Sequence, residues 1–214
     1  MISERLHRYA LRSYMDELMT VCLHDGLSFA ALFDKNSAKK LLRQWQIDNP
    51  DDLNNHIKWL LFGGGYNEEY RRIRNYLSAF TESDRKFYIE SMPPHNPQQR
   101  RQTIVERSWN RLSNGGIAAF DCAWSIVLAT AGSTLEWVIH DYKVAYSMEA
   151  VSRIKFSYNS WPEYVLGYTT GAEFSERFAT ENFAIKHAEF YQKLLRQWQM
   201  PLNRVKWDLP LGHI

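Results

Sequence analysis

The chain has 214 residues, of which 45% are hydrophobic and 14% aromatic, and this composition suits one globular domain. Its 26 basic and 24 acidic residues leave a formal net charge of +2, which argues against a dedicated nucleic-acid binder, since such proteins usually carry a strong basic excess. Only two cysteines occur, Cys22 and Cys122, too few for a disulfide framework, so buried thiols are predicted.

No run of the sequence approaches eighteen uncharged apolar residues, so no membrane contact is expected. The first twelve residues carry scattered charges and lack the apolar core of a signal peptide. The expected location is therefore the cytoplasm.

Helical periodicity dominates the first half of the chain. Asn36 or Ser37 is predicted to cap the second helix, and the Asp48-Asn49-Pro50 turn to begin the third. Gly63-Gly64-Gly65 is a strong helix breaker. The predicted helices cover residues 2–24, 37–45, 50–62, 68–80 and 83–90.

The second half is also predicted to be helical, over residues 98–113, 117–130, 148–158, 161–178 and 181–199. The apolar run of residues 117–135 is predicted to be the central core helix. Ser133 to Glu136 has the pattern of a capping box, and Ser147 is predicted to cap the helix after it. The tail, residues 201–214, could add an extended strand or wrap the surface.

These elements predict an all-α fold, a compact bundle of about 8–10 helices with an irregular C-terminal tail. Residues 1–214 are read as a single helical domain. The proline-rich segment from Met92 to Pro97 is the clearest loop, so the domain could divide into an N-terminal part, 1–92, and a C-terminal part, 98–200.

The segment Ser160–Phe174 begins like a capped helix, because Ser160 is a good N-cap and Glu163 follows three residues later. Gly167 and Gly171 lie four residues apart and so share a face that a second helix could approach closely. The segment predicts a tightly packed helix and carries no recognisable chemistry.

Three motifs follow one another between residues 45 and 178. They are Trp45, Ile47, Asp48, Leu53 and Trp59-Leu60 leading to Gly64-Gly65; Gly116–Asp121 opening an apolar helix with Ala131-Gly132 further on; and Ser160-Trp161, Tyr164, Gly167-Tyr168, Gly171 and Phe174.

This pattern resembles a bacterial family known as domain of unknown function 1266. The resemblance implies an enterobacterial-type cytoplasmic protein and carries over no activity. Two departures stand out: Trp124 occupies a position where the family often has arginine, and Gly-Gly-Tyr at 64–66 replaces Gly-His-Arg. No function that depends on those basic side chains is carried over.

Asp121 is the one acid in an apolar stretch. It could be a catalytic base with a raised pKa, because burial disfavours the charged form of a carboxyl. The alternative, which we favour, is a structural acid bonded to a backbone N–H or to an arginine, since buried polar groups are normally paired.

Glu136 and His140 lie four residues apart on a predicted helix, with Asp141 adjacent, and such spacing can place two metal ligands on one face. No third ligand accompanies them at diagnostic spacing, so a surface pair or a capping interaction is favoured. We therefore predict no metal site and no cofactor.

Arginines form two groups on predicted helices. Arg100, Arg107 and Arg111 share a stripe with Arg101 beside it, and Arg71, Arg72 and Arg74 form the second group. Either group could meet phosphates or an acidic partner. The favoured alternative is a solvated face with local partners such as Glu106.

The absence of a recognisable catalytic motif favours a non-enzymatic module that binds another protein, in an accessory, immunity or stress role. Its predicted binding residues are Arg100, Arg107, Arg111, Trp161, Tyr164 and Tyr168. One alternative is an enzyme whose pocket joins Asp121, Glu136 and His140 to the aromatics of residues 160–174. A second is a weak nucleic-acid binder that uses the Arg100–Arg111 helix, although nucleic acid is not the expected partner.

Overall fold

The protein is described by a computed structural model in which residues 2–20, 22, 32–93, 96–175 and 205–209 are placed. Every regular element in these residues is a helix, which confirms the predicted all-α class. The helices are α1 (Ile2–Thr20), α2 (Lys35–Gln44), α3 (Pro50–Leu61), α4 (Gly65–Leu77), α5 (Glu82–Glu90), α6 (Pro97–Ser108), α7 (Ala118–Thr134), α8 (His140–Ser157) and α9 (Trp161–Ser175).

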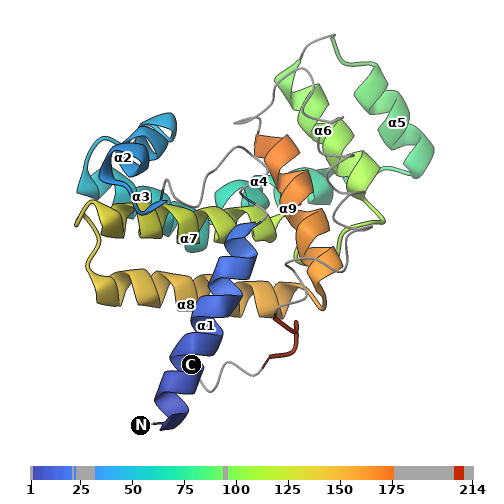
Figure 1. Ribbon diagram of the computed structural model, residues 1–214. Helices are drawn as coiled ribbons and strands as arrows, with labels where there is room; N and C mark the ends of the chain where they lie inside the picture. Colours follow the sequence, from blue (N-terminus) through green and yellow to red (C-terminus); the bar gives the residue numbers. More distant parts are fainter. Residues whose placement is uncertain (1, 21, 23–31, 94–95, 176–204, 210–214) are drawn as a thin grey trace.

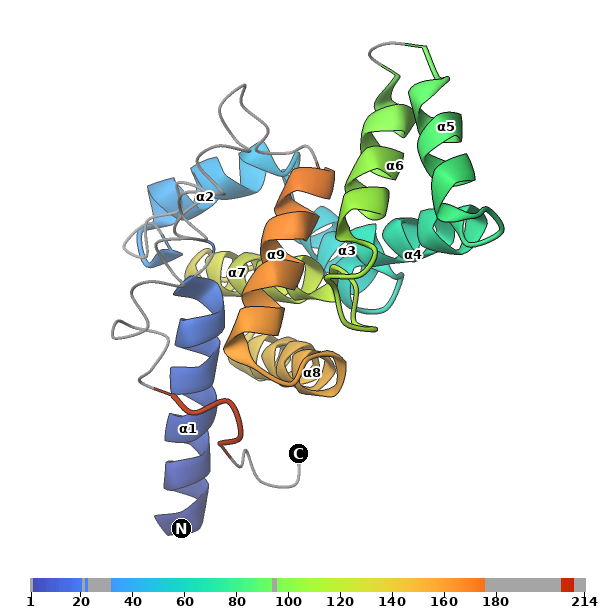
Figure 2. The ribbon, with the colours of Figure 1, turned by 90° about the vertical axis from the view of Figure 1, so that its right-hand side faces the viewer.

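Helix α7 is the centre of the fold, as its apolar sequence predicted. It is buried from Ala119 to Gly132, and α1, α2, α3, α4, α8 and α9 all pack against it. Helix α8 lies alongside α7, and α9 crosses the N-terminal end of α7 (Figure 1). Helices α5 and α6 project from one side of the molecule (Figure 2).

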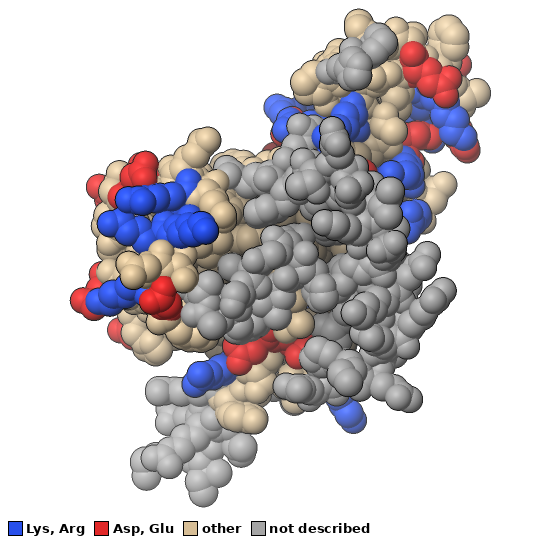
Figure 3. Space-filling model, turned by 45° about the horizontal axis from the view of Figure 1, so that its top comes forward, with Lys and Arg blue, Asp and Glu red and all other residues tan. Residues whose placement is uncertain are grey.

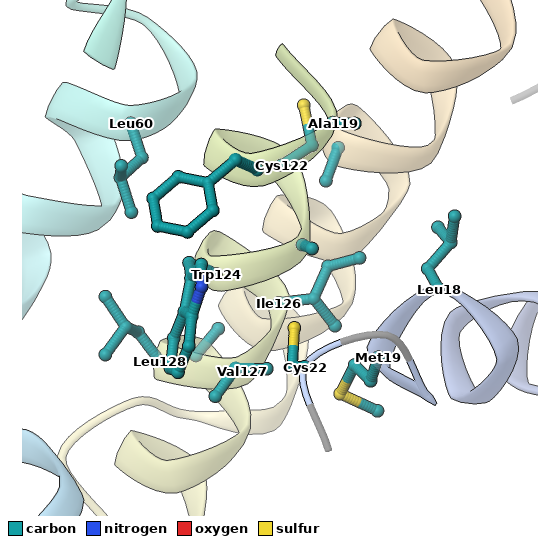
Figure 4. Close-up of a cluster of buried hydrophobic side chains, with 14 of the residues drawn as sticks. Leu18, Met19, Cys22, Leu60, Ala119, Cys122, Trp124, Ile126, Val127 and Leu128 are labelled. Atoms are coloured by element: carbon teal, nitrogen blue, oxygen red, sulfur yellow. The ribbon is translucent and has the colours of Figure 1, made fainter. Parts of the chain in front are cut away.

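The main core surrounds α7 and is rich in aromatic rings. Trp124 packs against Trp45 with 5.0 Å between ring centroids. Side chains of α1 and α3 flank α7, with Leu18 and Leu60 on different sides of it (Figure 4). Both cysteines are buried thiols in this core, as predicted.

A second, smaller core lies under α4, α5, α6 and α9. Its buried members are Tyr70, Leu77, Ile89, Ile104, Val105, Leu112, Ile117 and Phe174. Arg85 of α5 lies at its edge, where the guanidinium stands 4.3 Å from the ring centroid of Trp109 and Nε donates to Glu106 at 2.6 Å. Helix α9 contributes buried residues to both cores, and the partly buried Tyr66 of α4 packs against both.

Two predicted helix starts are wrong. Ser133 and Thr134 belong to α7, and Glu136 follows in a left-handed conformation with φ of 62°. Ser147 lies inside α8, where its hydroxyl donates to the carbonyl of Lys143 at 2.8 Å. A serine or threonine hydroxyl can bond the carbonyl one turn earlier instead of capping a new helix.

Other boundaries follow local capping chemistry. Helix α3 begins at Pro50, within the predicted turn, and the side chain of Asn49 caps it by accepting from the N–H of Asp52. Helix α2 is capped by Asp34 instead of Asn36 or Ser37. The predicted helix over residues 181–199 lies outside the described residues. The described part of the tail, 205–209, forms a turn.

The close approach of a second helix that was predicted for the α9 glycines is confirmed at Gly171, whereas Gly167 meets a tyrosine side chain. A Cβ added at Gly171 would stand 2.4 Å from Cβ of Phe120 on α7, and one at Gly167 would stand 2.6 Å from the hydroxyl of Tyr158.

Among the described residues, none of the helices combines the length and apolar character that crossing a bilayer requires.

Candidate functional site

Two glycine-rich segments, Gly63–Gly65 and Gly115-Gly116, lie close together in the fold, at the N-termini of α4 and α7. The first N–H groups of a helix lack partners within the helix. Gly64, the N-cap of α4, has no side chain to satisfy them, and Ile117, the N-cap of α7, makes no side-chain cap either. Both helix starts therefore depend on groups from elsewhere in the chain.

Each helix caps the other. The carboxyl group of Asp121 on α7 accepts from the backbone N–H of Tyr66 at 3.2 Å and of Asn67 at 2.9 Å, in the first turn of α4. In return, Oδ1 of Asn67 accepts from the N–H of Ile117 at 2.8 Å. The hydroxyl of Tyr158 completes the arrangement, because it accepts from the N–H of Ala119 at 2.9 Å and donates to the carbonyl of Gly116 at 3.0 Å. We call Gly65, Asn67, Gly116, Asp121 and Tyr158 the α4–α7 junction.

Glycine is required at two places in the α4–α7 junction. Gly65 and Gly116 have φ of 53° and 59°, in the left-handed region that other residues rarely adopt. A Cβ at Gly65 would stand 2.5 Å from Oδ2 of Asp121, and one at Gly116 would stand 2.6 Å from Oδ1 of Asn67. The capping side chains therefore occupy the space that a side chain at either glycine would need.

Asp121 is only 2% exposed and contacts no cation in the described residues. Burial raises its pKa to about 8, against the opposing effect of the two backbone N–H groups. Burial also raises the pKa of the neighbouring Cys122 thiol and of the Tyr158 hydroxyl. Its bonds to backbone N–H groups are those that the structural alternative expected of this residue.

This burial predicts a pH dependence of stability. The unfolded carboxyl releases its proton near pH 4, whereas the folded one keeps it up to about pH 8, so the folded state binds one more proton between these values. The free energy of unfolding should therefore fall as the pH rises through this window, by at most about 1.4 kcal/mol per pH unit. Urea denaturation of the wild type and of Asp121→Asn at several pH values checks this. Parallel curves for the two proteins would contradict it.

Glu136 and His140 do not join Asp121. Both are exposed, and Glu136 forms an ion pair with Lys35 at 2.7 Å. They follow the C-terminal end of α7, roughly 20 Å along the helix from Asp121. Glu136 lies in the loop and His140 is the first residue of α8, so they do not share a helix face. No group of three potential metal ligands occurs in the described part of the chain.

The predicted arginine stripe is partly neutralised by remote acids. Arg107 forms an ion pair with Glu173 of α9, and Arg101 forms one with Glu69 of α4 at 2.5 Å. Glu106, which we expected to serve its own helix, pairs with Arg85 of α5. Arg100 and Arg111 are exposed and have no ion pair with any described residue.

The aromatic residues predicted to bind a partner are core residues. Trp161, Tyr164 and Tyr168 are all buried. The indole N–H of Trp161 donates to the carbonyl of Val205 at 2.9 Å, and the hydroxyl of Tyr164 donates to the carbonyl of Leu18 at 2.8 Å. Trp161 and Tyr164 therefore attach the described tail and α1 to the core. Because all three aromatic side chains are buried, they do not offer a surface to a partner.

The family described as Protein of unknown function (DUF1266) matches residues 40–207, well over half of the chain and the whole α4–α7 junction. The chain belongs to this family. No match was found among the curated proteins or among the solved structures. In this DUF1266 protein, Gly65, Gly116 and Asp121, three of the residues that carried the resemblance, belong to the α4–α7 junction.

A shallow groove of about 550 Å³ lies between α4 and the start of α6. It is lined by Glu69, Arg72, Ile73, Asn96, Pro97, Gln98 and Arg101. Since Arg101 and Glu69 already neutralise each other there, Arg72 is the one cation lining this DUF1266 groove that has no ion pair with a described residue.

Sequence reasoning missed two features of this DUF1266 protein. One is Asn67, whose partner lies 50 residues away. The other is the outer face of α2, where Lys39, Lys40 and Arg43 are all exposed. The spacing of basic residues at 35, 39, 40 and 43, with no acid between them, was the signal that could have found this face.

Proposed function

We propose that the protein is a non-enzymatic helical module that binds another protein. The observation that carries this proposal is the complete engagement of Asp121 in the α4–α7 junction, buried and bonded to two backbone N–H groups. The residue with the best claim to acid–base chemistry is thereby used to hold two helices together. The exposed charged faces that remain suit recognition better than catalysis.

The enzyme alternative has less support. A catalytic acid or base must lie within hydrogen-bond reach of the substrate or of another reacting group. Asp121 is buried, whereas Glu136 and His140 are exposed beyond the other end of α7. Three ionisable groups in such separate positions do not act on one substrate atom.

The proposed place of action is the bacterial cytoplasm. The burial of Cys22 and Cys122 as thiols supports a reducing compartment, because oxidising compartments favour disulfides. The bacterial origin rests on the family resemblance.

The proposal is tested by cross-linking and affinity capture of the full chain in its own cells, with Asp121→Asn as the comparison. The variant removes the only acid of the α4–α7 junction and retains an amide oxygen that can accept one of the two N–H groups. We expect both proteins to capture the same partner when circular dichroism shows that both are folded. Neither protein capturing a partner, with both strictly monomeric, would refute the proposal.

A further inference from the structure

Helix α2 has one face in the core and one face in solvent. Ala38, Leu41 and Leu42 are buried, whereas Lys39, Lys40 and Arg43 are exposed. Figure 3 shows basic side chains gathered on the part of the molecule that Figure 1 labels α2. We call Lys39, Lys40 and Arg43 the α2 cationic face.

The charges of the α2 cationic face are not neutralised within the described structure. Lys35, at the start of the helix, is paired with Glu136, but none of the three residues of the face has an ion pair or a side-chain hydrogen bond to a described residue. Arg43 lies in the last turn, where the helix dipole favours a cation. Lys39 and Lys40 lie earlier and repel Arg43 at four- and three-residue spacing, which costs a few tenths of a kcal/mol per pair. Folding alone therefore does not account for this cluster.

Acidic residues flank the α2 cationic face along the chain on both sides. Asp34 caps the helix and Glu136 lies beside Lys35 at the N-terminal end. Asp48 and Asp51 follow at the C-terminal end, between α2 and the first turn of α3, and both are exposed. The cationic stretch from residue 39 to residue 43 rises only about 6 Å along the helix axis.

We propose that the α2 cationic face docks a short acidic segment of a partner protein. This inference rests on the proposed function and names the surface and the chemistry of the partner. A nucleic-acid backbone or an anionic membrane carries its negative charge far beyond a few ångströms and would meet the carboxylates at the ends of the face. A short run of Asp or Glu in a protein fits between them, and its flanks can be neutral or basic.

The arginines of α6 fit an acidic partner less well. Arg101 and Arg107 are already paired with Glu69 and Glu173, so a partner carboxylate would have to displace an existing one. The α2 cationic face offers three side chains with no such competitor among the described residues.

The experiment uses the full chain and measures binding of a fluorescent oligoglutamate peptide by anisotropy at low salt. The test variant is Lys39→Gln/Lys40→Gln/Arg43→Gln. The matched control is Arg12→Gln/Lys58→Gln/Lys206→Gln, which removes the same charge from exposed positions of α1, α3 and the tail. We expect affinity to fall by about tenfold in the α2 variant and by less than about twofold in the control. Thermal unfolding confirms that both variants remain folded.

Duplex RNA and phosphatidylserine vesicles serve as competing probes. Tighter binding of either probe than of the peptide, lost in the α2 variant, would overturn the acidic-protein assignment. Equal losses in the two variants, or no peptide binding by the wild type, would overturn the docking face itself. If the wild type and the α2 variant captured a cellular partner equally well, this inference would be refuted and the proposed function would stand. If neither protein captured any partner, the proposed function itself would be refuted.

Discussion

Replacing Gly65 with alanine is expected to lower the free energy of unfolding by about 3 kcal/mol, a large part of the stability of a typical domain. The left-handed backbone at Gly65 alone costs a residue with a side chain about 1 kcal/mol or more. The new methyl carbon would also stand 2.5 Å from Oδ2 of Asp121, and moving that carboxyl group weakens its bonds to the N–H groups of α4. Each buried N–H left without an acceptor adds about 1–3 kcal/mol.

Urea denaturation followed by circular dichroism measures this loss. Arg71→Ala is the control, because Arg71 is exposed in the same helix and alanine favours helix formation, so its change should stay within about 0.5 kcal/mol. A Gly65→Ala protein as stable as the control would show that the close contact with Asp121 does not require glycine at position 65.

Replacing Asp121 with alanine is expected to destabilise the protein by about 2–4 kcal/mol. The N–H groups of Tyr66 and Asn67 lose their acceptor at a buried position, and the removed carboxyl leaves a small cavity beside Gly65. Chemical denaturation at about pH 6, where burial keeps the carboxyl protonated, gives the comparison with the wild type.

Asp51→Ala is the matched control for Asp121→Ala. Asp51 is an exposed acid in the first turn of α3, so its removal should cost only about 0.3–1 kcal/mol through the helix dipole. If Asp121→Ala cost no more than Asp51→Ala, the capping role assigned to Asp121 would be wrong. Asn67→Ala should be strongly coupled to Asp121→Ala, because each residue caps the helix that carries the other.

The parts of the fold that local sequence encodes were predictable. The apolar run that became α7, the Asn49-Pro50 start of α3 and the close contact at Gly171 all follow from periodicity, capping and side-chain size within a few residues. The mistaken starts at Ser133 and Ser147 show where such local rules compete. Their patterns fit a helix cap equally well, but packing continued the helices through both residues.

The partners of the candidate site were not predictable, because they lie far apart in the sequence. The structural interpretation of Asp121 anticipated a bond to a backbone N–H, but nothing near it in the sequence indicates Tyr66 and Asn67 as its donors. Glu173 neutralises Arg107 across 66 positions of sequence, and Glu69 neutralises Arg101 across 32. Periodicity can place a charge on a helix face, but only the packing of the helices brings its counter-charge to it.

The pairing of Asn67 with Ile117 and of Asp121 with Asn67 has a consequence for how the chain folds. Both contacts close nearly the same stretch of about 50 residues, which contains all of α5 and α6. Closing such a loop costs about 3 kcal/mol of chain entropy, and whichever contact forms first removes that freedom for both. The second contact then forms between groups that are already neighbours, so the two helix starts should appear and disappear together, as one cooperative step.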